Sequence, residues 1–150
     1  MSHLNLHSEP LKKQWCDYYG HLNEAYYLVV FSNATFAFQN HFGLGEEYFR
    51  AEGRSLYTLE SHIRYLEEVR GDVTLEVASF VFGVDQKRIR IGHVMKVSGA
   101  EKATFECMLL HFDTNESKVV PMCDSKVSQI KEWELEQLPE WAGQKLRDIR

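Results

Sequence analysis

One short segment of the chain gathers the residue types that acyl-transfer chemistry needs. It holds a carboxylate at Asp17, a turn-permitting Gly20, an imidazole at His21, an amide at Asn23 and a second carboxylate at Glu24. A helix that begins there presents unbonded N–H groups and partial positive charge, which stabilise an oxyanion. A carboxylate held a few residues upstream could face the same point as a base or nucleophile. The segment therefore predicts a site that acts on a carbonyl compound.

The same residues also have a purely structural interpretation. Asp, Gly and Asn are common in turns and helix caps, and His21 could lie in a surface turn. Cys16, beside Asp17, is interpreted as a small half-buried residue rather than a nucleophile. The local chemistry taken alone favours the structural interpretation slightly.

The elements that must position this segment can be read from the periodicity of the chain. Residues 23–40 are expected to form a helix, with Asn23 as its cap and Glu24 in its first turn. The run AYYLVVFSNATFAF is apolar on nearly every face and is too short to span a bilayer. Such a helix must be enclosed by other structure, and a sheet wrapped around it is expected.

Strand periods account for most of the remaining chain. Alternation of apolar and polar residues predicts a weak strand before Pro10 and four longer strands at about 55–66, 73–78, 88–97 and 103–112. Short turns between the long strands imply antiparallel neighbours. A short helix is expected at 44–50 and a last one from Asp124 or Ser125 to about Leu138, before a polar tail. The expected fold class is α+β, with a curved antiparallel sheet around the long apolar helix.

Composition sets broad limits on the domain organisation and the partners. The 150 residues, 44% hydrophobic and 26% charged, contain no linker, so one domain is expected over 1–150, with a helical tail at about 124–150. The net charge of -5 argues against nucleic acid as a partner. With neither a signal pattern nor an apolar run of spanning length, no membrane association is expected, and the cytoplasm is the expected location. No HExxH motif or metal-ligand cysteine spacing is present, so no metal is predicted. No Gly-rich phosphate loop is present, and the lack of a GxSxG elbow argues against a serine hydrolase.

A family resemblance gives the segment more weight. The pattern D-x-x-G-H-x-N-x-x-x-Y, formed by Asp17, Gly20, His21, Asn23 and Tyr27, resembles the 4-hydroxybenzoyl-CoA thioesterase-like branch of the hotdog superfamily. The order of elements from about residue 4 to residue 122 is similar too. The resemblance implies a hotdog fold, in which a long helix is wrapped by an antiparallel sheet. It also implies a homodimer or homotetramer whose sheets join edge to edge, with active sites at the subunit interface.

The resemblance also assigns roles. Asp17 matches the family's catalytic carboxylate, which would activate water or attack the thioester directly. The backbone N–H near Glu24 matches the oxyanion donor. Asn23 and His21 would position groups around the thioester or hold the turn, and Tyr27 would pack or touch substrate. Many members have an asparagine where this chain has Glu24, and this departure bears on acyl preference.

A narrower resemblance concerns the substrate. The runs WCDYYGHLNEAYYLVVFSNAT, SLYTLESHIRYLEE, DQKRIRIGHVM and MLLHFDT are similar to those of betainyl-CoA thioesterases of carnitine breakdown. A trimethylammonium group binds well against aromatic faces, at roughly 0.5–2 kcal/mol for each contact. Glu60 or Glu24 could add charge. The aromatic candidates are Trp15, Tyr18, Tyr19, Tyr26, Tyr27, Phe31 and Tyr57, although any single one of them is better interpreted as core.

Charged residues farther along the chain are further candidates. Glu60, His62 and Arg64 share one strand face and could orient substrate if that face meets the active-site groove; otherwise they are a solvated cluster. The basic cluster Lys87, Arg88 and Arg90 could hold CoA phosphates, although each could equally lie at a solvated strand end. His93 and His111 fall on apolar faces and are interpreted as hydrogen-bonded core or interface histidines rather than metal ligands.

The sequence therefore predicts an acyl-CoA thioesterase with CoA as part of the substrate and no separate cofactor. Two alternatives remain open. Hotdog hydratases or dehydratases also use a carboxylate and a histidine, but commonly as D-x-x-x-x-H, whereas Asp17 and His21 are one residue closer. A non-catalytic domain that binds acyl-CoA for regulation is the other alternative.

Overall fold

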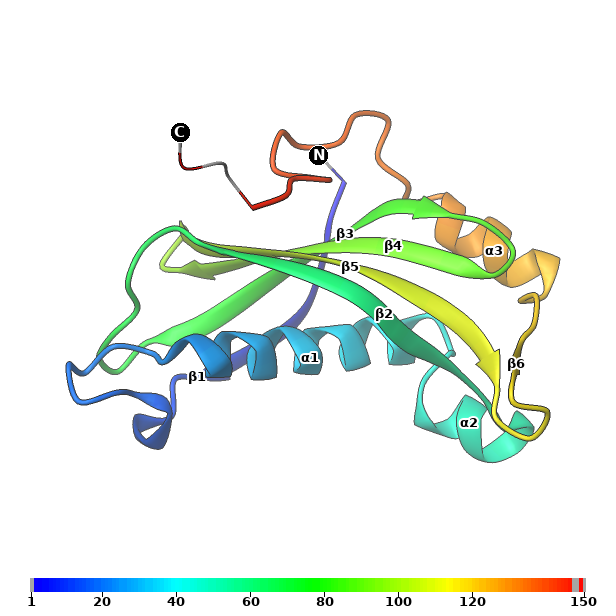
Figure 1. The fold of residues 1–150 in the computed structure, drawn as a ribbon, viewed down its shortest axis with the longest axis horizontal. Helices are drawn as coiled ribbons and strands as arrows, with labels where there is room; N and C mark the ends of the chain where they lie inside the picture. The colour runs from blue at the N-terminus through cyan, green and yellow to red at the C-terminus, as the bar shows by residue number, and fades with distance from the viewer. Residues whose placement is uncertain (1, 147–148, 150) are drawn as a thin grey trace.

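The computed structural model describes residues 2–146 and 149 as a curved sheet with a long helix beneath it (Figure 1). Residues 1, 147, 148 and 150 of the expected 1–150 domain and its tail lie outside the described residues. The elements in chain order are β1 (Leu4–Pro10), a 3-10 turn η1 (Lys13–Trp15), α1 (Glu24–His41), α2 (Glu46–Glu52), β2 (Arg54–Tyr65), β3 (Thr74–Val84), β4 (Arg88–Val97), β5 (Ala100–Asp113), β6 (Lys118–Val119) and α3 (Asp124–Lys131).

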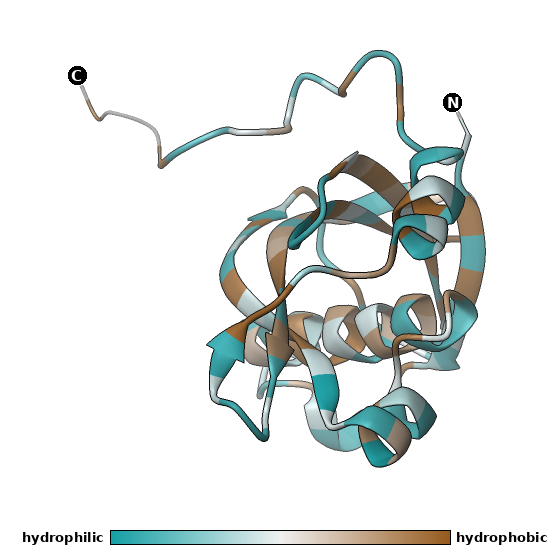
Figure 2. Ribbon diagram, turned by 90° about the vertical axis from the view of Figure 1, so that its right-hand side faces the viewer, coloured by the Kyte–Doolittle hydropathy of each residue, from teal (hydrophilic) through white to brown (hydrophobic). Residues whose placement is uncertain are grey.

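The sheet is antiparallel throughout, in the order β1-β3-β4-β5-β2, with the short β6 paired to β5. Its curvature places α1 on the concave side (Figures 1 and 2). This arrangement confirms the expected α+β class and hotdog architecture. Because the order ends at β2, one long strand keeps an unpaired edge in a single copy of the chain.

Helix α1 provides the centre of the core, but the sheet does not enclose it completely. Tyr27, Val30, Phe31, Ala34 and Phe38 are buried against the strands. On the opposite side, apolar side chains remain exposed, with Leu28 at 46%, Val29 at 39% and Phe36 at 58%. The expected wrapping of this helix by the sheet is confirmed for most of its surface, and the exposed side chains mark the part that a single copy leaves uncovered.

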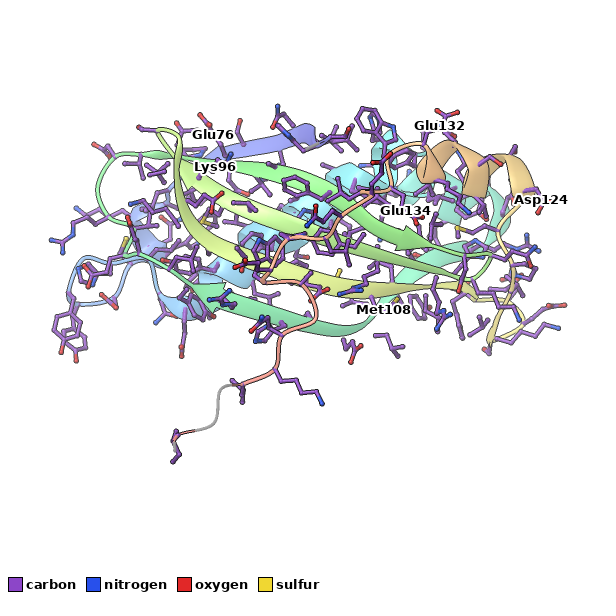
Figure 3. The ribbon with its side chains drawn as sticks, turned by 90° about the horizontal axis from the view of Figure 1, so that it is seen from above. Glu76, Lys96, Met108, Asp124, Glu132 and Glu134 are labelled. Carbon is purple, nitrogen blue, oxygen red and sulfur yellow. The ribbon has the colours of Figure 1, made fainter. Side chains whose placement is uncertain are left out.

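The C-terminal segment covers the outer face of the sheet, on the side away from α1 (Figures 1 and 3). Helix α3 ends at Lys131, so the expected helix to Leu138 is wrong in its second half. The chain instead becomes extended, and the Leu135 N–H donates to the Val81 carbonyl at 3.0 Å. Leu135, Leu138, Trp141 and Ala142 pack on an outward apolar cluster of Ala78, Phe80, Phe82 and Val94. The extended path allows the segment after α3 to cover this cluster, whereas a continued helix would leave the cluster exposed.

The two histidines on apolar strand faces are buried and hydrogen bonded. His93 lies between the Thr35 and Ser79 hydroxyls, each at 2.9 Å, and its burial lowers the pKa of the imidazole to about 3. His111 contacts the Tyr48 hydroxyl at 2.8 Å and the Val120 carbonyl at 2.7 Å. Their interpretation as satisfied core histidines is confirmed.

The low pKa of His93 makes the stability of the fold depend on pH. The folded state keeps this imidazole neutral, whereas the unfolded chain binds its proton below about pH 6.5. The contribution of the neutral His93 imidazole to the free energy of unfolding is complete above that pH, and it is lost as the pH falls toward 3. We expect His93 to account for about 2 kcal/mol of lost unfolding free energy between pH 7 and pH 5.

Urea unfolding at both pH values measures this contribution. His93→Gln, which can still hydrogen bond with Thr35 and Ser79, should show a shallower pH dependence than the unmodified protein, whatever its absolute stability. His41→Gln, at the exposed end of α1, is the matched control and should keep the full dependence. Equal pH dependence in the His93→Gln and unmodified proteins would contradict the assignment.

Candidate active site

The Asp17 carboxylate is held by its own turn. Its Oδ1 accepts from the Tyr19 N–H at 2.9 Å and the His21 N–H at 3.1 Å. The Gly20 N–H donates to the Asp17 carbonyl at 3.0 Å, and Gly20 has φ +83°, a conformation that glycine adopts without strain. Among the described residues no hydrogen bond is made by the other carboxylate oxygen, Oδ2. The turn therefore fixes the carboxylate through one oxygen and leaves the second available.

The same turn leads directly into the start of α1. Cys16 and Leu22 form an antiparallel bridge, and the Asn23 N–H donates to the Trp15 carbonyl at 2.9 Å. Asn23 then caps the helix, because its Oδ1 accepts from the N–H of Ala25 at 3.0 Å.

This cap leaves one amide of the first turn unbonded. The Tyr26 N–H reaches the Asn23 carbonyl at 3.0 Å, and the Ala25 N–H is taken by the Asn23 side chain. Within the described part of the chain, the Glu24 N–H has no acceptor. A free amide at a helix N-terminus is a donor for an oxyanion, as the sequence predicted for this position.

His21 supports the turn from behind. Its Nε2 accepts from the Arg70 guanidinium at 2.6 Å and lies 3.2 Å from the Glu68 carboxylate, which also pairs with Arg70 at 3.1 Å. The Leu22 N–H donates to the Val69 carbonyl at 2.8 Å. No hydrogen bond joins the His21 imidazole to the Asp17 carboxylate among the described residues. His21 thus ties the turn to the β2–β3 connection.

A cavity of ≈ 500 Å³ opens beside the Asp17 turn. Asp17 is half-buried in its wall, and Lys13 is the cation that lines it. The complete lining is Leu11, Lys13, Cys16, Asp17, Tyr18, Gly20, Gly71 and Asp72. Substrate-sized space is therefore present where the carboxylate is.

The aromatic candidates divide into packed and free rings. Trp15 is buried and stacks on Tyr26 at 5.7 Å, and Phe31 is wholly inside the core. Tyr27 is also buried, and this burial raises the pKa of its phenol to about 12. Tyr18, by contrast, is 89% exposed on the turn.

The two remaining aromatic candidates, Tyr19 and Tyr57, lie in different surroundings. Tyr19, 68% exposed, packs on the Tyr18 ring at 4.3 Å. Tyr57 lies on β2, where it stacks on Phe112 at 4.7 Å. Trp15, Tyr27 and Phe31 therefore have structural roles in a single copy, whereas Tyr18 and Tyr19 can contact a ligand as they stand.

In a single copy of the chain, the strand-face candidates lie apart from Asp17. Glu60 and His62 line a separate cavity of ≈ 410 Å³ with Arg90 and Glu106, beside the C-terminal segment on the outer face of the sheet. Arg64 lines a neighbouring hollow of ≈ 310 Å³ on the same strand. Strand β2 lies beside the helix as expected, because Gln39 Nε2 donates to the Leu56 carbonyl at 3.4 Å and the Tyr65 hydroxyl donates to the Glu24 carbonyl at 3.3 Å. The side chains of Glu60, His62 and Arg64 nevertheless line cavities beside the C-terminal segment rather than the Asp17 cavity.

The basic cluster is also remote from Asp17 within one chain. Lys87 and Arg88 lie at the β3–β4 hairpin, near α3 and at the opposite end of the sheet from the Asp17 turn (Figure 1). Arg88 is paired through two nitrogens with Asp85 at 2.8 and 2.6 Å. Arg90 is paired with Glu106 at 2.7 Å. Only Lys87 of the three has no recorded acid partner in the described part of the chain.

Sequence reasoning missed three residues of this site: Tyr65, Glu68 and Arg70. All three follow the turn by more than forty positions: Tyr65 is the last residue of β2, and Glu68 and Arg70 lie in the β2–β3 connection. The run Arg70-Gly71-Asp72 indicated a short turn there, but the sequence did not indicate that Gly71 and Asp72 line the cavity.

Two general features concern cofactors and membranes. Across residues 2–146 and 149, no group of three or more His, Cys, Asp or Glu side chains is placed to hold a metal ion. None of the helices in that part of the chain is long and apolar enough to cross a membrane.

The fold and this turn define a hotdog-type protein with a carboxylate beside a helix N-terminus. Residues 11–138 match the thioesterase-like superfamily, and the chain belongs to that family. A betainyl-CoA thioesterase of Pseudomonas aeruginosa is 40% identical over 79% of this chain and 76% of its own length. An L-carnitine dehydrogenase/betainyl-CoA thioesterase of Agrobacterium fabrum is 38% identical over 98% of this chain, which spans only 31% of that relative.

Solved structures show the same fold. A candidate thioesterase from Pseudomonas putida KT2440 is 32% identical, with a TM-score of 0.82 over 98% of this chain and 97% of that one. A Staphylococcus aureus protein solved in complex with CoA has a TM-score of 0.88 at 20% identity, covering 99% of this chain and 98% of its own. The second likeness concerns the fold alone.

The cap at Asn23 can be tested by its contribution to stability. Asn23→Ala removes the acceptor for the Ala25 N–H and should lower the free energy of unfolding by about 1 kcal/mol. Asn23→Asp keeps an acceptor oxygen and should retain most of it. Urea unfolding of the three proteins makes the comparison, and equal stability of Asn23→Ala and the unmodified protein would show that the cap is not needed.

Proposed function

We propose that this protein is an acyl-CoA thioesterase, which hydrolyses a thioester to a carboxylic acid and CoA. The observation that carries the proposal is the free Oδ2 of Asp17 on the turn that ends at the unbonded Glu24 N–H. A thioester carbonyl needs a nucleophile or base on one side and an oxyanion donor on the other. One eight-residue segment supplies both.

The chemistry follows from these two groups. The thioester oxygen accepts from the Glu24 N–H while Asp17 either attacks the carbonyl carbon or takes a proton from an attacking water. The negative charge that develops on the oxygen is stabilised by the amide and the helix dipole. Collapse of the tetrahedral intermediate breaks the C–S bond and releases CoA. In the direct route, water then hydrolyses the anhydride formed on Asp17.

The names of the relatives point to a betainyl thioester as the substrate. The similarity amounts to 38% identity over 98% of this chain for one relative and 40% identity over 79% of it for another. CoA belongs to the substrate, so no separate cofactor is required. The hydratase alternative is less favoured, because His21 is engaged with Arg70 and Glu68 rather than with Asp17.

The active form is a dimer that joins two β2 edges. The free edge of β2 exposes Leu59 at 63%, and the neighbouring face of α1 exposes Leu28, Val29 and Phe36. Unpaired edges and apolar stripes of this kind need cover. Two dimers could assemble further into a tetramer.

Antiparallel pairing of two β2 strands would also complete the substrate site. It sets the Tyr65 end of one strand against the Arg54 end of the other. The β3–β4 hairpin lies at the Arg54 end, because Arg88 is opposite Leu110 and Tyr57 is opposite the same residue. A second copy would therefore bring its Lys87 and Arg88 toward this Asp17, where they could hold CoA phosphates.

Asp17→Asn tests the chemistry. The asparagine Oδ1 can still accept from Tyr19 and His21, so the turn should survive, but the base or nucleophile is lost. We expect thiol release from betainyl-CoA to fall by roughly 100-fold or more in kcat/KM. Asp72→Asn, in the wall of the same cavity, is the control for loss of one negative charge. A folded Asp17→Asn protein with unchanged turnover would refute the function, and tight binding of acyl-CoA without thiol release by the unmodified protein would favour a regulatory domain.

The dimer is tested by placing a charge on its edge. Leu59→Glu should convert the dimer to a monomer at micromolar concentration, because a carboxylate would be desolvated at the strand pair. Gln129→Glu adds the same charge on exposed α3 and should leave the dimer intact. Light scattering measures both variants, and a monomeric unmodified protein would contradict the β2 interface.

A further inference from the structure

The chemistry of a betainyl group limits where its charge can lie. One methylene separates the carbonyl carbon from the quaternary nitrogen. If the carbonyl oxygen accepts from the Glu24 N–H, the bond lengths place that cation within about 7 Å of the Glu24 nitrogen. The groups that distinguish it from an uncharged acyl group must therefore lie around the first turn of α1.

An aromatic ring stands within this region. The Tyr65 hydroxyl donates to the Glu24 carbonyl at 3.3 Å, and its ring is 50% exposed. Tyr27 packs against that ring edge-on, with centroids 5.0 Å apart and an interplanar angle of 89°. Because Tyr27 is buried, Tyr65 has a fixed support on one side and an open face for a ligand.

A carboxylate stands there as well. The Glu24 side chain is exposed, and it has no ion-pair partner among the described residues. Glu67, in the connection after β2, is by contrast paired with Lys102 at 2.7 Å. The Glu24 carboxylate therefore has no cationic side chain as a partner in the described part of the chain, and it belongs to the residue whose N–H fixes the acyl carbonyl in the proposed function.

These two groups match the recognition chemistry of a quaternary ammonium. Such a cation has no N–H to donate, so a protein can hold it only with aromatic faces and opposite charge. The helix N-terminus itself repels a cation, and a carboxylate on the first helical residue offsets that repulsion.

We propose that the Glu24 carboxylate and the Tyr65 ring are specificity determinants that select a quaternary-ammonium acyl group over an uncharged one of the same shape. The inference rests on the proposed thioesterase function and deepens it. It assigns acyl recognition to the start of α1 rather than to the exposed Tyr18 and Tyr19 rings at the tip of the turn.

A pair of substrates isolates the charge. Betainyl-CoA and 3,3-dimethylbutanoyl-CoA differ only in replacing the quaternary nitrogen by carbon, so their shapes match. The readout is the ratio of their kcat/KM values from thiol release by the full chain. We expect the unmodified protein to prefer betainyl-CoA and Glu24→Gln to lower the ratio roughly tenfold, which corresponds to about 1.4 kcal/mol.

Matched variants separate recognition from structure. Tyr65→Leu removes the ring and should lower the ratio, whereas Tyr65→Phe keeps the ring and should preserve it. Glu47→Gln removes a first-turn carboxylate from α2 and should leave the ratio unchanged. Tyr18→Leu tests the competing location and should also leave the ratio unchanged.

The outcomes distinguish this inference from the function on which it rests. A lower ratio in Glu24→Gln and Tyr65→Leu, but not in the controls, supports it. Hydrolysis without preference for the cation, an equal loss on both substrates, or a ratio that falls only in Tyr18→Leu overturns the inference and leaves the thioesterase function standing. Absence of thiol release from every acyl-CoA overturns both.

Discussion

The two hydrogen bonds that Asp17 Oδ1 accepts from its own turn are the constraint on which the site depends. They orient a carboxylate without using its second oxygen and without help from another side chain. The Asp17 turn is itself closed by the Cys16–Leu22 bridge and by the hydrogen bond from the Asn23 N–H to the Trp15 carbonyl. The helix start is therefore positioned relative to Asp17 by backbone geometry, which is stiffer than a side-chain contact.

The rest of the fold holds this short unit in place. Burial of Tyr27, Phe31 and Phe38 anchors α1 to the concave face of the sheet, so the helix start cannot shift along it. The β2–β3 connection supports the turn from the other side through Arg70 and His21. In the described part of the chain, the outer side of α1 lacks cover, and Lys13 is the cation that lines the Asp17 cavity. The exposed apolar side of α1 and the free edge of β2 could both be covered by a second copy of the chain.

Local features of this structure could be predicted from sequence, and long-range ones could not. Asn23 as a cap, Glu24 in the first turn and the alternation of the long strands are set by neighbouring residues, and they were found. The end of α3 was misjudged, because the extended path beyond Lys131 depends on Phe80 and Phe82 pointing outward from a distant strand. The apolar character of α1 was also recognised, but periodicity does not identify what covers each face, so the exposure of Leu28, Val29 and Phe36 in one chain could not be predicted. The roles of Tyr65 and Arg70 depend on a chain return that no local pattern encodes.

Glu24 illustrates how one position can serve two electrostatic demands. A carboxylate on the first helical residue stabilises the helix by roughly 0.3–1 kcal/mol. The same charge lies beside the amide that must stabilise an oxyanion, so on a neutral acyl group it opposes the developing negative charge. With a cationic acyl group the Glu24 carboxylate becomes favourable, because the positive charge of the substrate is attracted both to that carboxylate and to the developing oxyanion. An unpaired glutamate next to an oxyanion donor is therefore unfavourable for general thioester hydrolysis and favourable for a substrate that carries a cation one methylene from its carbonyl.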